Sequence, residues 1–273
     1  METETGFAEI NGAKIYYEVA GDGLPLVMIH AGIADSRMWD DQFAAFAPDY
    51  RVVRYDQRGF GKSEPAPGKF SRHENLHGLL KHLNIERAIL MGCSMGGSAA
   101  IDFALEYPQM TAGLILVGAG LSGFEWADWV QPEPEIEAQA AFEAGDYEKA
   151  AEIEAEMWVA GVGRTAADVD QAVLDKVREM NLVALCYEAL KLRETQYLDP
   201  PAFPCLGEIR VPTLVIVGEN DWPDIFAIAD ALTEKISGAQ KIIMPGTAHV
   251  PNMEKPAEFN QHVRTFLNGL NPA

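Results

Sequence analysis

Short runs of apolar residues alternate with amphipathic stretches along most of the chain. The runs that are long enough for strands fall at residues 7–10, 14–19, 26–29, 52–55, 88–91, 114–117, 214–217 and 242–244. The first two lie on either side of Asn11-Gly12, a pair that favours a hairpin turn. The later runs are continuously apolar, as expected of strands covered on both faces, and helical patterns separate most of them. This order predicts an α/β fold with a mainly parallel central sheet flanked by helices.

The alternation stops between about residue 121 and residue 200, where acidic, alanine-rich helical sequence takes over and no strand is expected. Asp146 is placed to cap a helix on which Ala150 and Met157 share a face. Residues 165–168 match a capping box ahead of a further apolar stripe. We therefore expect residues 1–120 and 205–273 to form the core, with residues 121–204 as a helical cap inserted into it.

The chain is strongly acidic. Asp and Glu number 41 against 21 for Lys and Arg, which gives a net charge of −20. Such a field opposes binding to phosphate backbones and anionic membrane surfaces, so neither nucleic acid nor a membrane is expected as a partner. The same field disfavours anionic substrates unless charges in the pocket override it.

Length and composition fit an ordinary globular protein, with 273 residues of which 48% are hydrophobic and 23% charged. The first ten residues lack the basic and apolar regions of a secretory signal, and no apolar run approaches the roughly 18 residues of a membrane helix. Cys93, Cys186 and Cys205 lie far apart with no Cys-x-x-Cys pair, which indicates free thiols in a reducing compartment. We expect a cytoplasmic protein, present as a monomer or a homodimer.

The strongest chemical motif follows the strand predicted at 88–91. Gly92, Ser94 and Gly96 form Gly-x-Ser-x-Gly between that strand and a helical stretch at 98–107, the setting in which this motif exposes a nucleophile. Glycines at the flanking positions remove the Cβ atoms that would clash across so sharp a turn. The helix also directs its N-terminus at the site, which favours developing negative charge. Ser94 is therefore the candidate nucleophile, with an incidental serine in a glycine-rich turn as the alternative.

With this motif in place, the chain resembles α/β-hydrolase fold enzymes over nearly its whole length. His30-Ala31-Gly32 is similar to the family's His-Gly oxyanion loop, although Ala31 stands where a glycine is usual. The resemblance implies an oxyanion hole made by the backbone N–H groups of Gly32 and Met95, with His30 near the substrate. Residues 56–63 resemble the family's Asp-x-Arg-Gly-x-Gly-x-Ser loop, to which we assign a structural role.

The family places its catalytic acid after a late strand, and the strand predicted at 214–217 leads to Asp221. Glu219 and Asp224 are nearby competitors. Some members carry the acid before the cap instead, but residues 118–120 offer no carboxylate there. By this resemblance, Asp221 is the acid.

His249 is the candidate base. It precedes a Glu-Lys-Pro sequence and a terminal helix at 257–267, which resembles the family's closing pattern, and the order serine, aspartate, histidine is the one this fold requires. In the mechanism that follows, His249 takes the proton of Ser94, Asp221 orients the imidazole, and water cleaves the acyl-serine. No cofactor or metal is needed.

A second motif points to a different chemistry. Residues 73–77 read His-Glu-Asn-Leu-His, and on a helix this pattern sets two zinc ligands one turn apart with Glu74 as a general base. Ser71 and Glu74 also match a capping box, which would occupy Glu74 with the backbone, and no third ligand is evident downstream. We interpret His73 and His77 as surface residues.

Three tryptophans, Trp126, Trp129 and Trp158, lie in or beside the predicted cap, with Phe124 and Met157 nearby. They pack the cap onto the core or, where they face the cleft, make an apolar site for an acyl chain or a lactone. The expected substrates are short-to-medium acyl esters or lactones, acyl-lactones included.

Several functions are compatible with this fold, because the residues of the pocket determine the function and the fold alone does not. Perhydrolases, acyltransferases and C–C bond hydrolases also use a serine nucleophile, whereas haloalkane dehalogenases resemble this chain with aspartate where Ser94 stands. A ligand receptor built on the fold could keep the triad with little turnover. Steady multiple turnover on an aryl ester would exclude it.

Overall fold

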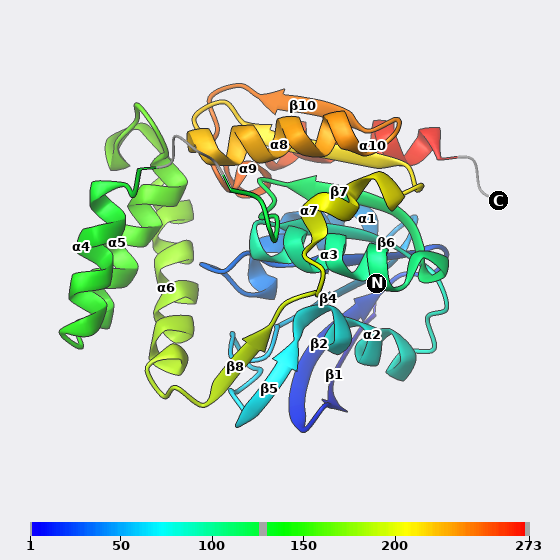
Figure 1. The fold of residues 1–273 in the computed structure, drawn as a ribbon, viewed down its shortest axis with the longest axis horizontal. Coiled ribbons are helices and arrows are strands. Elements are labelled where there is room, and N and C mark those ends of the chain that lie inside the picture. Colours follow the sequence, from blue (N-terminus) through cyan, green and yellow to red (C-terminus); the bar gives the residue numbers. More distant parts are fainter. Residues whose placement is uncertain (1, 126–129, 271–273) are drawn as a thin grey trace.

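A computed structural model describes residues 2–125 and 130–270 (Figure 1). Its main sheet has eight strands in the order β1-β2-β4-β3-β6-β7-β9-β10. In that order the strands span Thr3–Ile10, Ala13–Ala20, Arg51–Tyr55, Pro25–Ile29, Ala88–Cys93, Thr111–Val117, Thr213–Gly218 and Gln240–Met244. Every apolar run predicted to be a strand is one.

The pairing is also as predicted. β1 and β2 form an antiparallel hairpin, in which Asn11 and Gly12 both have positive φ (49° and 76°), as the primed turn of a tight hairpin requires. β2 pairs with β4 in the antiparallel sense, and all the remaining pairs of the main sheet are parallel. The carboxyl ends of the parallel strands therefore lie along one edge of the sheet.

Helices cover both faces of the sheet (Figure 1). One face packs against α2 (Arg72–His82), α3 (Met95–Glu106) and α8 (Pro223–Lys235), whose buried aliphatic residues share one apolar cluster with the strands. The other face packs against α1 (Asp40–Phe46) and α10 (Pro256–Gly269). The short helices are α7 (Ala202–Cys205), α9 (Pro251–Glu254), and the 3-10 turns η1 (Ser36–Trp39), η2 (Pro108–Met110), η3 (Ala166–Asp168) and η4 (Leu206–Glu208). All three cysteines are free, and Cys93 is buried.

Three helices, α4 (Glu133–Glu143), α5 (Tyr147–Ala160) and α6 (Gln171–Glu188), stand together at one end of the molecule, at the left in Figure 1. Asp146 caps α5 as predicted, accepting from the N–H of Lys149 at 3.1 Å. The predicted capping box at 165–168 forms, but it caps the short turn η3. The helix α6 begins after a separate N-cap, Asp170. We call α4 to α6 the cap; the limits 121–204 stay a prediction.

The prediction of no strand between residues 121 and 200 is wrong at one point. β8 (Arg193–Gln196) pairs in parallel with β5 (Gly68–Ser71) in a separate two-stranded sheet, and the two lie side by side in Figure 1. The sequence of β8 is Arg-Glu-Thr-Gln, without an apolar position. Its strand conformation depends on backbone pairing to a segment far away in the chain, which hydrophobic patterning cannot reveal.

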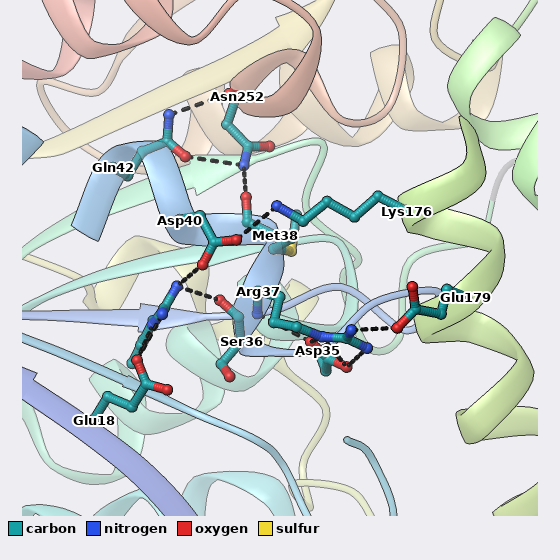
Figure 2. Close-up of polar contacts among 11 residues, drawn as sticks. Glu18, Asp35, Ser36, Arg37, Met38, Asp40, Gln42, Lys176, Glu179 and Asn252 are labelled. Carbon is teal, nitrogen blue, oxygen red and sulfur yellow. Dashed lines mark hydrogen bonds and ion pairs between the residues drawn. The ribbon is translucent and has the colours of Figure 1, made fainter. Parts of the chain in front are cut away.

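Ion pairs connect the cap to the core, as Figure 2 shows. Arg37 in η1 contacts Glu179 of α6 at 2.5 Å, and Lys176, one helical turn earlier on α6, contacts Asp40 at 2.7 Å. Arg37 also pairs with the buried Asp35 at 2.8 Å. One face of α6 is thereby held against the loop that follows β3.

Candidate active site

Ser94 lies in the sharp turn between β6 and α3. Its backbone has φ 52° and ψ −116°, a strained combination for a residue with a side chain, and its N–H donates to the carbonyl of Val117 at 2.9 Å. A Cβ on Gly92 would lie 2.3 Å from the carbonyl oxygen of Gly96, and one on Gly96 would lie 2.2 Å from that of Ile29. The turn predicted around the candidate nucleophile is present, and it needs both glycines.

Asp221 and His249 follow the adjacent parallel strands β9 and β10, so their side chains meet at the same sheet edge. His249 Nδ1 lies 3.0 Å from each carboxylate oxygen of Asp221, and both residues are buried. Asp221 thus holds the proton on Nδ1 and leaves Nε2 as the basic nitrogen. The pair is tied to the nucleophile turn, because the thiol of Cys93, the residue before Ser94, donates to the carbonyl of His249 at 3.5 Å.

The competing carboxylates lie in other environments. Glu219 is exposed and accepts from the backbone N–H of Gly246 at 2.8 Å. Asp224 sits in the first turn of α8, where burial raises its pKa and the charge of nearby Asp221 raises it further. Among the described carboxylates, only Asp221 bonds to His249.

The cap contacts the candidate base, His249, directly. The Trp158 ring of α5 packs on the imidazole of His249, and the carbonyl of Trp158 accepts the backbone N–H of His249 at 3.2 Å. The indole N–H of Trp222 donates to the carbonyl of Met157 at 3.2 Å. Trp158 therefore lies with its ring against the candidate base, and its predicted contact with substrate stays a prediction.

The other aromatic residues divide into two groups. Phe124 makes an edge contact with Phe203, at 5.2 Å between ring centroids, and both rings pack against the core. Trp126 and Trp129, predicted to bind substrate, lie outside the described residues.

Gly32 and Met95 are neighbours across the gap between the loop after β3 and the start of α3. A Cβ on Gly32 would lie 3.8 Å from the Cβ of Met95. Met95 opens α3, and the first N–H groups of a helix have no acceptor within it. Over residues 2–125 and 130–270, no acceptor in the chain takes the N–H of Gly32 or of Met95. Two unused donors near the nucleophile are what an oxyanion hole requires, and this assignment stays a prediction.

His30 is fully buried, and both ring nitrogens are engaged within the chain. The N–H of Gln57 donates to Nε2 at 2.9 Å, so Nδ1 carries the proton and faces the carbonyl of Ala31 at 2.8 Å. Burial lowers the pKa of His30, which keeps the ring neutral. This arrangement opposes the predicted substrate contact and makes His30 a positioning residue for the loop that carries Gly32.

The loop at 56–63 has the structural role assigned to it. Asp56 accepts from the backbone N–H groups of Ser36 and Lys62, both at 2.8 Å. Ser63 donates to the carbonyl of Asp56 at 2.7 Å and accepts from the N–H of Tyr16 at 2.8 Å. These bonds join the loop to β2 and η1 and position Gln57 against His30.

The His-Glu-x-x-His sequence lies on α2, but its side chains are engaged elsewhere. His77 stacks on Tyr107 with ring centroids 4.1 Å apart, and Glu74 accepts from the hydroxyl of the same tyrosine at 2.9 Å. His73 is buried, so its assignment to the surface was wrong, and Ser71 makes no side-chain cap bond. Within the described residues, no cluster of three or more potential metal ligands is found.

A cavity of about 380 Å³ opens beside Ser94 and Met95. Its other lining residues are Arg72, Ser98, Ala99, Asp102, Gln196 and Tyr197, and all of these except Ala99 have polar side chains. Sequence reasoning missed this wall. A partial signal was present, because Ser98 and Asp102 follow Ser94 at intervals of four residues, which places them on one helix face.

The model of the alpha/beta hydrolase family matches residues 26–262, so the chain belongs to that family. A 2-hydroxy-6-oxononadienedioate/2-hydroxy-6-oxononatrienedioate hydrolase of Paraburkholderia xenovorans is 29% identical over 267 residues, covering 93% of this chain and 90% of the relative. A pimeloyl (acyl-carrier protein) methyl ester esterase of Yersinia enterocolitica is 27% identical, covering 94% and 99%. Among solved structures, Est816, described as an N-acyl homoserine lactone degrading enzyme, is 28% identical with a TM-score of 0.76, covering 96% of this chain and 100% of that one.

No helix in the described part of the chain is long and apolar enough to cross a membrane.

Proposed function

We propose that this protein is a serine hydrolase that cleaves carboxylic esters, either short-to-medium acyl esters or lactones, through an acyl-serine on Ser94. The observation that carries the proposal is the buried pair of His249 and Asp221, 3.0 Å apart, tied through Cys93 to the strained turn of Ser94. A neutral serine hydroxyl needs such a base to become a nucleophile.

In the proposed reaction, Nε2 of His249 takes the hydroxyl proton as Ser94 attacks the carbonyl carbon. The N–H groups of Gly32 and Met95 stabilise the oxyanion, and His249 then protonates the leaving alkoxide. Water, activated by the same imidazole, releases the acid and restores Ser94. Asp221 orients the ring and balances its charge throughout.

Two of the similar proteins support an ester or a lactone as the substrate class. One is named as a methyl ester esterase and the other is described as degrading a lactone. We propose that the partner is accordingly a small molecule, with neither nucleic acid nor a membrane involved.

The test is steady-state hydrolysis of aryl esters of graded acyl length and of a lactone panel. Each buried methylene contributes roughly 0.8 kcal/mol, so kcat/KM should rise with acyl length until the pocket is full and then fall. A monotonic rise to long chains would point to a lipase. A single burst without further turnover would favour a receptor built on this fold.

Cleavage of a carbon–carbon bond is the second candidate. The Paraburkholderia relative is named for an oxo-dienedioate, a compound whose name contains no ester. Substrates of that kind absorb strongly, so loss of their absorbance measures this activity directly. A higher kcat/KM on such a keto acid than on the best ester would replace the ester proposal while keeping the triad.

A further inference from the structure

The cavity beside Ser94 brings together three segments that are far apart in the sequence. Arg72 is the first residue of α2, the wall from Ser94 to Asp102 belongs to α3, and Gln196 and Tyr197 come from the end of β8. A volume of about 380 Å³ is in the range of small-molecule sites. The cavity is therefore large enough for part of a substrate whose reacting carbonyl lies at Ser94.

A polar strip leads away from the nucleophile along α3. Ser94, Ser98 and Asp102 are spaced by four residues, so they lie on one helix face. At a rise of about 1.5 Å per residue, Asp102 lies roughly 12 Å along the helix axis from Ser94. An extended acyl group of a few carbons would place its far end between these two residues.

Two charged residues, Arg72 and Asp102, line the cavity, and they carry their charges over different pH ranges. The guanidinium of Arg72 keeps its charge at all ordinary pH values. Asp102 is buried, accepts from the Ser122 hydroxyl at 3.4 Å, and has its pKa raised to about 6, chiefly by burial and against the lowering effect of Arg72. Near pH 6 and below, the lining therefore carries net positive charge. An incoming anion favours the neutral form of Asp102 further.

Other titratable groups lie on the elements packed around Asp102. His73 of α2 approaches it at 4.0 Å, but burial lowers the pKa of His73, so that ring is neutral at pH 7. Tyr197 lines the same cavity from the β8 side, and Cys205 is the titratable residue of α7. Among the residues that line the cavity, Arg72 and Asp102 are the two that carry full charges, so they set the sign of its lining.

We propose that this cavity binds a carboxylate at the far end of the substrate's acyl group, with Arg72 as its cationic anchor and Asp102 as the residue that sets the pH dependence of binding. The proposal rests on the proposed function, because it takes Ser94 as the nucleophile. It makes half-esters of dicarboxylic acids, or lactones that carry a carboxylate, the preferred substrates. The local cation then overrides the unfavourable field of the whole protein.

The test compares aryl half-esters of succinate, glutarate and adipate with their neutral half-amides of equal length. The measured quantity is the ratio of kcat/KM for acid over amide, in which the pH dependence of the triad cancels. A charge-assisted hydrogen bond predicts a ratio of about ten or more for the best length, rising as the pH falls towards 6.

Two variants and a control sharpen the test. Arg72→Gln should lower the ratio about tenfold or more, because it slows the reaction of the acid more than that of the amide. Asp102→Asn should raise the ratio at pH 8 and remove its pH dependence. Lys81→Gln makes the same charge change at an exposed position of α2 and should leave the ratio unchanged.

The inference and the proposed function fail in different ways. Equal rates on acid and amide, with Arg72→Gln slowing both alike, would overturn the carboxylate subsite and leave the ester hydrolase standing. If no ester turns over, calorimetric binding of one half-ester and its half-amide of equal length to Ser94→Ala still decides the matter. Tighter binding of the acid than of the amide, lost when Arg72→Gln is added, supports the carboxylate subsite. Equal binding of the acid and the amide overturns it.

Discussion

The indole of Trp158 lies against the imidazole of His249, with ring centroids 4.3 Å apart and planes tilted by 38°. The carbonyl of the same tryptophan accepts the backbone N–H of His249, so the last turn of α5 contacts both the ring and the main chain of the candidate base. The cap therefore helps to fix the orientation of a residue that belongs to the core.

Trp158→Ala should lower kcat about tenfold to a hundredfold, because a small misplacement of the base is enough to lose productive geometry. Trp158→Phe keeps an aromatic face on the imidazole and should retain most of the activity. The measurement is kcat on an aryl ester together with thermal unfolding of each variant. A folded Trp158→Ala protein with kcat within twofold of wild type would show that the ring does not position His249.

Ser94→Ala should lower kcat by roughly four orders of magnitude or more, because it removes the nucleophile and little packing. Ser237→Ala, at an exposed position after α8, is the matched control and should have no effect. Residual activity is measured at high enzyme concentration after circular dichroism has established folding. Near-normal turnover by folded Ser94→Ala would end the triad assignment.

Asp221→Asn should reduce kcat by about four orders of magnitude, since an amide no longer holds the required imidazole tautomer. Glu219→Gln should change kcat little, because Glu219 is exposed and bonds only to the backbone of Gly246 in the described part of the chain. The two variants are compared on one ester at one pH. A larger loss in Glu219→Gln would mean that the acid is misassigned.

Asp102→Asn should raise the free energy of unfolding above that of wild type at neutral pH, and by a smaller amount at acid pH. In the folded protein the pKa of Asp102 is raised to about 6, so folding favours the neutral form. The stability that the neutral Asp102 carboxyl contributes is fully present below its unfolded-state pKa. It is lost as the pH rises through about 6. The free energy of unfolding of Asp102→Asn relative to wild type should therefore increase by about 2 kcal/mol between roughly pH 4 and pH 7. Urea unfolding across that range measures it, and a difference that is flat with pH would contradict it.

The ion pairs of Arg37 should differ strongly in strength. Glu179 is 69% exposed, so a double-mutant cycle between Arg37 and Glu179 should give a coupling below about 1 kcal/mol that shrinks with added salt. Asp35 is 2% exposed, and its coupling to Arg37 should be larger, at about 2 kcal/mol. Equal couplings would mean that burial of Asp35 does not set the strength of the pair.

The sequence by itself determined the central sheet and the nucleophile turn, because both depend on local rules. A continuous apolar run such as residues 26–29 favours a buried strand wherever it occurs, and Gly92 and Gly96 are needed by the turn that contains them. Ser94, Asp221 and His249 were predicted as the triad from the family's pattern relative to those strands, and their catalytic roles stay predictions.

Only the tertiary structure decided what surrounds the site. β8 has a polar sequence and exists through pairing with β5, and Arg72 reaches the cavity of Ser94 only because α2 and α3 lie side by side. His30, polar and expected at the substrate, is fully buried with both ring nitrogens bonded inside the chain. Each of these depends on which side chains and strands meet across long stretches of sequence. Neither periodicity nor a short motif contains that information, because both describe only near neighbours along the chain.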